Sequence, residues 1–229
     1  MDRAIKSDTP QGPIRYASEI RPHDLLWISG AEVLSAACAL PEWVQRSIAA
    51  VPVVVVRRDI WREGVIPVGI RGRTRSERFA AFVALREVRQ RVTPEDLANE
   101  RRWRENQRPE FAAIHHALES IAERWKSITW GPVGSVGFEL ATGVSVTTNE
   151  SDLDLVIRAR ESITKSEAKE LLQSVVGLAI RTDAQVETPL GAVALAEYAA
   201  PVAMRILMKT CAGPVLITDP WAQPMPAAV

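Results

Sequence analysis

The sequence has few of the features that mark secreted, membrane-spanning or zinc-binding proteins. Among its 229 residues there are two cysteines, Cys38 and Cys211, and three histidines. Two thiols far apart in the chain form neither a disulfide framework nor a zinc site. No run of about 18 apolar residues and no signal peptide is present. The formal net charge is zero. We therefore expect a cytoplasmic protein with no membrane partner and no nucleic-acid partner.

What the sequence does contain is typical of a globular protein, with 47% hydrophobic and 24% charged residues. Its pattern of helices and strands predicts the α+β class. We expect a loose leader over residues 1–20, a small Arg-rich N-terminal α/β domain over 21–108, and a C-terminal domain with a mixed sheet over 109–229. The boundary is placed after the charged stretch that ends before Pro109.

Local patterns assign the main elements. β-Branched runs predict buried strands at 51–56 and 66–70. Apolar residues at three-to-four spacing predict a helix over 76–91 and another over 109–125. Residues 164–167 match a capping box, which predicts a helix start there. Further strands are expected at 128–130, 152–157, 180–186 and 205–209, and a short helix at 195–198.

The chemistry is expected at Asp152 and Asp154. Successive side chains of a strand alternate between its two faces, so these carboxylates share one face while Leu153 and Leu155 point into the core. Two neighbouring carboxylates repel each other, and a divalent cation with a preference for oxygen ligands, such as Mg²⁺, removes that conflict. Taken alone, the pair favours two solvated aspartates on an exposed edge strand over a metal site.

Two further features strengthen the metal interpretation. Gly134 and Ser135 follow the expected strand at 128–130, and a glycine there lets backbone approach a ligand while the serine donates hydrogen bonds. If a helix begins at this point, its N-terminal amides favour a phosphate. Asp183 lies on a later strand and would join the aspartate pair if the two strands are neighbours. It would then act as a metal ligand or as a general base, and Glu187 is the rival for that third carboxylate.

Gly134-Ser135, Asp152-x-Asp154 and a later carboxylate together resemble the nucleotidyltransferase superfamily of the DNA polymerase β type. Over residues 20–222 the chain also resembles the malonate decarboxylase holo-(acyl-carrier-protein) synthases, which are phosphoribosyl-dephospho-CoA transferases. The segments that carry this likeness are RPHDLLW (21–27), IPVGIRG (66–72), GPVGSVGFELATG (131–143), SDLDL (151–155), VETP (186–189), LAEY (195–198) and DPW (219–221).

The resemblance implies a polymerase β-like catalytic domain and a specific reaction. A serine of the apo acyl carrier protein subunit of malonate decarboxylase would attack the triphosphate of 2'-(5''-triphosphoribosyl)-3'-dephospho-CoA, and pyrophosphate would leave. Asp152 and Asp154 match the catalytic aspartates of the family, and Asp183 is the third candidate. Such a transfer needs positioning and charge neutralisation more than covalent help from the protein.

Basic residues outside the aspartate motif are candidates for binding the anionic substrate. Residues 57–91 contain ten arginines against four acids. Arg71, Arg73 and Arg75 lie in one glycine-containing loop, and arginine forks match phosphate geometry. They would bind the triphosphate or the CoA pyrophosphate, dock an acidic carrier protein, or simply form a solvated basic face. Lys209, on a late strand, is a further candidate for a phosphate contact.

Two other functions remain open at this point. The chain could be a nucleotidyltransferase that uses an ordinary nucleoside triphosphate on a small molecule or on another protein. It could also be a non-catalytic binding module that keeps the scaffold. The intact Asp152, Asp154 and Gly134-Ser135 argue against the second alternative, and the likeness of the first half of the chain argues against the first.

Overall fold

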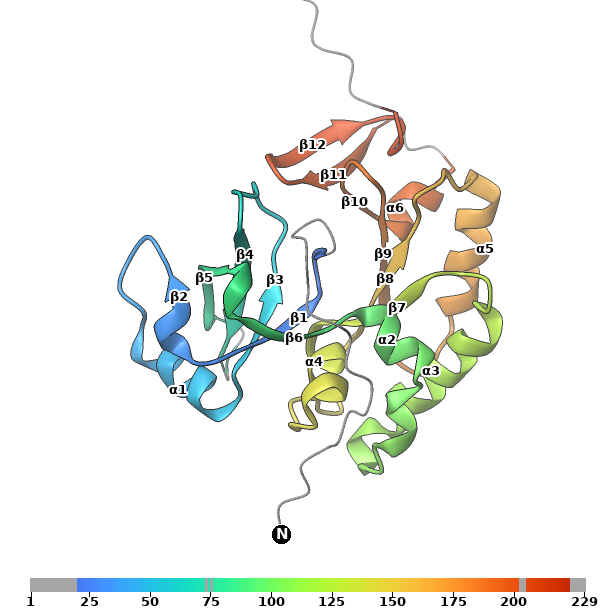
Figure 1. The fold of residues 1–229 in the computed structure, drawn as a ribbon. Helices are drawn as coiled ribbons and strands as arrows, with labels where there is room; N and C mark the ends of the chain where they lie inside the picture. Colours follow the sequence, from blue (N-terminus) through green and yellow to red (C-terminus); the bar gives the residue numbers. More distant parts are fainter. Residues whose placement is uncertain (1–19, 73, 75, 202–204, 223–229) are drawn as a thin grey trace, which may run out of the picture. The chain divides into compact units, whose positions relative to one another are not determined.

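The computed structural model describes residues 20–72, 74, 76–201 and 205–222. The chain forms two compact units. The first extends to Thr93 and includes Ala141–Gly143, and the second comprises Pro94–Leu140 and the chain from Val144 onward. Each unit contains a six-stranded sheet together with helices (Figure 1). The α+β class predicted from the sequence is therefore confirmed.

The N-terminal unit is built on an antiparallel sheet in the order β2-β5-β4-β3-β1-β6. Helix α1 packs on this sheet at β4, and its Val44 and Ile48 are buried there. The strands predicted at 51–56 and 66–70 are confirmed as β3 and β4. The elements are β1 (Leu25–Ile28), β2 (Leu34–Ser35), α1 (Glu42–Ala50), β3 (Val53–Val56), β4 (Val65–Arg71), β5 (Arg78–Ala84) and β6 (Val88–Val92).

The helix predicted over residues 76–91 is wrong. This segment forms strands β5 and β6, joined by a short 3-10 helix at Leu85–Glu87. Along β5 the buried positions Ala81 and Val83 alternate with more exposed ones, which is the period of a strand. Pairing along β4 extends from Val65–Ala84 to Arg71–Arg78. Hydrogen-bonded pairing with β4 therefore makes residues 78–84 a strand. The helix-like spacing of the two phenylalanines and the valine in this segment is what led to the wrong prediction.

The C-terminal unit contains a mixed sheet, as predicted. The order of its strands is β12-β11-β10-β9-β8-β7. Strands β8 and β9 run parallel, and α5 forms the connection between them. The neighbouring pairs β7–β8, β9–β10, β10–β11 and β11–β12 are antiparallel. The elements are α2 (Pro94–Asn99), α3 (Ala112–Arg124), β7 (Trp130–Val133), α4 (Gly134–Thr142), β8 (Leu153–Arg158), α5 (Lys165–Val175), β9 (Thr182–Glu187), β10 (Ala192–Ala194), α6 (Leu195–Ala199), β11 (Ile206–Thr210) and β12 (Gly213–Ile217).

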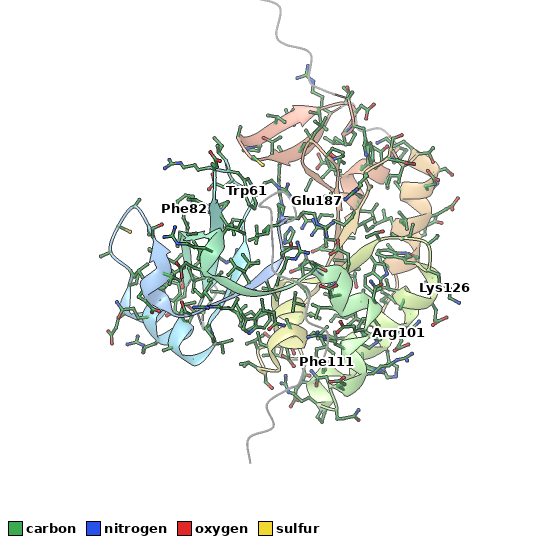
Figure 2. The ribbon with its side chains drawn as sticks, viewed as in Figure 1. Trp61, Phe82, Arg101, Phe111, Lys126 and Glu187 are labelled. Carbon is green, nitrogen blue, oxygen red and sulfur yellow. The ribbon has the colours of Figure 1, made fainter. Side chains whose placement is uncertain are left out.

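One face of the C-terminal sheet forms the core of this unit. Leu153, Leu155 and Ile157 of β8 are buried on that face, and helices α3 and α5 lie beside each other along the sheet (Figure 1). The predicted apolar stripe of α3 is confirmed. The stripe residues Phe111 (labelled in Figure 2), Ile114, Leu118, Ile121 and Trp125 are all buried.

Tryptophans fix the first strand of this sheet. Trp130 opens β7, and its ring centroid lies 6.2 Å from that of Trp103 and 5.5 Å from that of Trp125. Two of these indole rings also donate a hydrogen bond from the ring N–H group. The indole N–H of Trp103 donates to Glu119, and that of Trp125 donates to Ser174. Aromatic rings with satisfied N–H groups hold β7, and therefore its far end at Val133, in a defined place.

Two local features complete the frame around the site. Helix α2 packs directly on β7, where an added Cβ at Gly131 would lie 2.0 Å from the carbonyl oxygen of Pro94. Helix α5 begins with the predicted capping box, formed by Thr164 and Glu167.

Within the described ranges, no helix has both the length and the apolar character required to cross a bilayer.

Candidate functional site

The three aspartates singled out in the sequence lie at one end of the β8–β9 pair. Asp154 of β8 stands opposite Asp183 of β9 in the parallel register, and Asp152 directly precedes β8. The core-facing neighbours Leu153 and Leu155 are fully buried, whereas Asp154 is exposed. The predicted sharing of a face is therefore confirmed, and the strand of Asp183 is indeed the neighbour of the Asp152–Asp154 strand.

Gly134 and Ser135 come to the same end of the sheet. Strand β7 runs antiparallel to β8, so its last residue, Val133, pairs with Asp154. Helix α4 begins at Gly134, so the condition under which N-terminal amides would favour a phosphate here is met. Gly134 has a φ of 65°, and an added Cβ would lie 2.5 Å from Oδ2 of Asp154. Backbone conformation and the close carboxylate both require glycine at this position.

Arg181 is a site residue that the sequence analysis missed. Its Nη1 lies 3.6 Å from Oδ2 of Asp152, and its Nη2 donates to Oδ2 of Asp183 at 3.2 Å. One guanidinium therefore spans two of the three carboxylates. Strand alternation contained the signal, because Arg181 stands two residues before Asp183 and so faces the same side.

Glu187 does not lie beside the three aspartates. It lies four residues after Asp183 along β9, opposite Arg158, and its side chain is 8% exposed (Figure 2). Arg158 places Nη1 3.6 Å from Glu187 and donates from Nε to Glu95 at 2.9 Å. The Glu187 carboxylate thus belongs to a buried ion-pair group with Arg158 and Glu95, and Asp183 is the third carboxylate at the strand end.

Lys209 shares the face of the aspartates but stands at a distance from them. Residues directly opposite each other in a ladder face the same side, and Glu187 pairs with Ala192, which pairs with Lys209. Lys209 is therefore two strands and four residue steps from Asp183. With spacings of about 4.8 Å between strands and 3.3 Å along them, the separation is roughly 16 Å. A phosphate held at the aspartates would not reach Lys209, whereas the far end of a long substrate would.

The arginine candidates fall elsewhere. Arg71 ends β4 in the N-terminal unit, where it pairs with Arg78 across the hairpin. Arg73 and Arg75 lie outside the described residues. The helix expected after this loop is wrong, because the segment forms strand β5, which pairs antiparallel with β4. Substrate binding by these three arginines stays a prediction.

The donor set at the strand end suits a hard divalent cation. Among the described residues, no group of three or more His, Cys, Asp or Glu side chains is arranged to hold a metal ion by itself. Magnesium does not need such a cage, because it is commonly bound by one or two carboxylates together with substrate phosphates and water. Two of these carboxylates already bind a positive group, because the guanidinium of Arg181 forms ion pairs with Asp152 and Asp183. The oxygen donors at the strand end therefore fit Mg²⁺ bound together with substrate phosphates.

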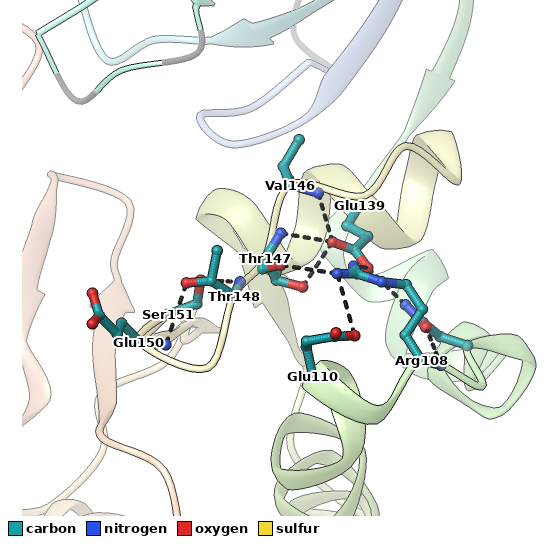
Figure 3. A network of polar contacts seen from close by, with 9 residues as sticks. Arg108, Glu110, Glu139, Val146, Thr147, Thr148, Glu150 and Ser151 are labelled. Atoms are coloured by element: carbon teal, nitrogen blue, oxygen red, sulfur yellow. Dashed lines mark hydrogen bonds and ion pairs between the residues drawn. The ribbon is translucent and has the colours of Figure 1, made fainter.

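A buried glutamate fixes the loop that leads to Asp152. Glu139 of α4 accepts hydrogen bonds from the backbone N–H groups of Val146 and Thr147, both at 2.8 Å, and from the Thr147 hydroxyl at 2.7 Å (Figure 3). On its other oxygen it accepts from Asn106 at 2.8 Å and from Arg108 at 2.6 Å. The chain between α4 and β8 is thereby attached to the segment before α3.

The same contacts set the ionisation of Glu139. Burial raises the pKa of this carboxyl, but the hydrogen bonds donated by Thr147, Val146 and Asn106 outweigh burial and lower the pKa from 4.5 to about 2. The carboxylate is thus charged throughout the physiological range. Its contribution to stability is complete above the unfolded-state pKa near 4.5 and is lost as the pH falls from there towards about 2.

We expect Glu139→Gln to lower the free energy of unfolding by about 2 kcal/mol at pH 7, because an amide cannot accept from all five donors. The substitution also removes the nearer of two carboxylates from Arg108, which keeps only the longer ion pair with Glu110 at 3.7 Å. Urea unfolding at pH 7, 5 and 3.5 measures the effect. The difference between variant and wild type should shrink as the pH falls. Glu170→Gln, which changes an exposed glutamate of α5, is the matched control. An equal loss in both variants, or a difference independent of pH, contradicts the assigned role.

A pocket of about 320 Å³ adjoins Asp152. Its walls are the start of α3, the loop before β8 and the turn before β9, and it includes Asp152 and Arg181. Glu110, Thr148 and Ser151, which also line it, are drawn in Figure 3. A ligand in this pocket would lie beside Asp152 and within reach of the guanidinium that now bridges the aspartates.

Comparison with known proteins gives a consistent result over nearly the whole chain. The family model described as phosphoribosyl-dephospho-CoA transferase MdcG N-terminal domain matches residues 21–94, and that of the C-terminal domain matches residues 96–220. A phosphoribosyl-dephospho-CoA transferase from Azotobacter vinelandii is 40% identical over 205 residues, which is 89% of this chain and 95% of that protein. A phosphoribosyl-dephospho-CoA transferase from Klebsiella pneumoniae is also 40% identical, over 90% of this chain and 98% of that protein. No solved structure gives a significant match.

Proposed function

Because the chain belongs to the phosphoribosyl-dephospho-CoA transferase family, we propose that it modifies the apo acyl carrier protein subunit of malonate decarboxylase. The donor is 2'-(5''-triphosphoribosyl)-3'-dephospho-CoA, the acceptor is a serine of the carrier, and pyrophosphate is released. The observation that carries this proposal is the register of Asp154 with Asp183, beside Gly134 and Asp152. It supports a site for a charged phosphate group at the end of three neighbouring strands.

The carboxylates would bind the metal and orient the reacting groups. Asp152 and Asp154 would hold Mg²⁺, with Asp183 as the third ligand or as the acceptor of the serine proton. When bound, the metal would neutralise charge on the triphosphate and make pyrophosphate a better leaving group. The exposed positions of Asp154 and Asp183 leave them open to a substrate, in contrast to the buried Glu187.

The start of α4 would bind the phosphates. A helix N-terminus offers unpaired N–H groups and a partial positive charge, and α4 starts at Gly134 directly beside the Asp154 carboxylate. Ser135, in its first turn, would donate from its hydroxyl and backbone. Lys209 would contact the distant end of the nucleotide, and Arg71, Arg73 and Arg75 would bind either the substrate phosphates or the carrier.

The decisive experiment measures the mass of the carrier. The protein is incubated with Mg²⁺, the triphosphoribosyl precursor and the purified apo carrier, and the carrier is examined by intact mass spectrometry. We expect a gain equal to the phosphoribosyl-dephospho-CoA group, located on a serine by peptide mapping, with one pyrophosphate released per transfer. A carrier of unchanged mass, beside a family member that is active in the same mixture, refutes the proposed acceptor and donor.

A further inference from the structure

Arg181 is placed to take part in the proposed metal-dependent transfer, on which the role described below rests. We propose that Arg181 has two alternating partners during substrate binding. Without a metal its guanidinium compensates the charge of Asp152 and Asp183. When Mg²⁺ binds the carboxylates with a phosphate chain, the guanidinium leaves them and binds phosphate oxygens. Arg181 thereby holds the carboxylates together before the substrate arrives and then positions the triphosphate.

The first state follows from the contacts. Arg181 places Nη1 3.6 Å from Oδ2 of Asp152 and Nη2 3.2 Å from Oδ2 of Asp183, and both carboxylates would otherwise repel each other and Asp154. A divalent ion and a guanidinium cannot both occupy the position between the same oxygens. Binding of the metal therefore competes with these ion pairs.

The Arg181 side chain is suited to release. It is 72% exposed, and its partners Asp152 and Asp183 are 36% and 61% exposed. Exposed ion pairs are worth only about 0–1 kcal/mol each because water screens the charges. A divalent cation can displace such pairs, in contrast to the buried contacts of Arg158, which is 6% exposed.

The second state follows from the pocket. Arg181 is attached to the strand pair through its backbone, since its carbonyl oxygen accepts from the N–H of Leu153 at 2.9 Å. The base of the side chain is thus fixed while its tip is free to turn. The pocket of about 320 Å³ has both Asp152 and Arg181 in its wall. Of the basic side chains, Arg181 alone lines this pocket within the described part of the chain, and its planar fork matches phosphate oxygens.

The experiment measures metal binding directly, using Mn²⁺ in place of Mg²⁺ and the electron paramagnetic resonance signal of free Mn²⁺. The variants are Arg181→Gln, Arg181→Lys, Asp154→Asn and the control Arg160→Gln, an exposed arginine of the same unit. Without phosphate we expect Arg181→Gln to bind Mn²⁺ about three- to tenfold more tightly than wild type, the effect of removing two exposed ion pairs. Arg181→Lys and Arg160→Gln should stay within about twofold of wild type.

The titration is then repeated with inorganic pyrophosphate. Here Arg181→Gln should bind the Mn²⁺–pyrophosphate complex about tenfold more weakly than wild type, the scale of one lost charge-assisted contact. Arg181→Lys should recover part of that affinity. This reversal between the two conditions distinguishes exchange of partners from a merely structural role, which would shift both titrations in the same direction.

The outcomes separate this inference from the proposed function. If Asp154→Asn weakens Mn²⁺ binding but Arg181→Gln equals wild type in both titrations, the role of Arg181 is overturned and the metal site stands. If Arg181→Gln tightens Mn²⁺ binding without weakening pyrophosphate binding, the exchange is overturned. If Asp154→Asn binds Mn²⁺ as well as wild type, the metal does not bind at this site, and the proposed role of the aspartates fails together with that of Arg181.

Discussion

Replacing Asp154 by asparagine is expected to lower the rate of transfer by about 10²–10³-fold, the scale of removing one key electrostatic group from a polar active site. Oδ2 of Asp154 lies 2.5 Å from the position that a Cβ at residue 134 would occupy, and Asp154 stands opposite Asp183. An amide has nearly the same shape but lacks the negative charge that a metal ligand needs. The loss should therefore appear in kcat, with the fold unchanged.

The measurement is the initial rate of carrier modification at saturating substrate, together with the thermal midpoint of unfolding. The midpoint of Asp154→Asn should stay close to that of wild type, because the side chain is exposed and the amide keeps its shape. Asp59→Asn changes an aspartate paired with Arg57 in the N-terminal unit and should keep its activity. A rate for Asp154→Asn within about threefold of wild type would falsify the assignment, since the expected loss is far larger.

Replacing Gly134 by alanine is expected to lower the rate of transfer by about 10²-fold, because a displacement of about 1 Å in a catalytic group has that effect. The new Cβ would lie 2.5 Å from Oδ2 of Asp154, well inside van der Waals contact. Either Asp154 or the start of α4 must move. In addition, a φ of 65° strains any residue with a Cβ, at a cost of about 1 kcal/mol in stability.

Gly64 offers a matched control for the strain. Its φ is 67°, and no heavy atom lies within 4 Å of its built Cβ. Gly64→Ala should therefore lose about 1 kcal/mol of unfolding free energy in urea from strain alone. Gly134→Ala should lose at least as much, because the contact with Asp154 adds to the strain, and only Gly134→Ala should lose activity. If both variants retain normal transfer rates, the close approach of Gly134 to the Asp154 carboxylate has no catalytic importance.

Short-range patterns predicted the centre of the candidate site well. Asp152 and Asp154 are separated by one core leucine, so strand alternation alone places them on one face. The capping box at Thr164 is likewise encoded within a few residues, and it is confirmed. Such features depend on neighbours along the chain, which is why a single sequence reveals them.

Features that depend on pairing between distant segments were not predictable in this way. Residues 76–91 have helix-like spacing, and the seven-residue ladder with β4 overrides it. Glu139 gives no signal in the sequence, because its donors come from segments 31–33 residues before it and 7–8 residues after it. The choice between Asp183 and Glu187 needed the register of β9, which assigns Glu187 to Arg158.

The parallel pairing of β8 with β9 has a consequence for how the site forms. Parallel strands cannot be joined by a tight turn, so Asp154 and Asp183 meet only after helix α5 has crossed over and docked. Contacts of this long sequence separation are among the slower ones to form in folding. Assembly of the three carboxylates should therefore be a late step in folding. Substitutions at the α5 capping box, although remote from the carboxylates, should delay the recovery of Mn²⁺ binding after refolding more than they delay the recovery of helical signal.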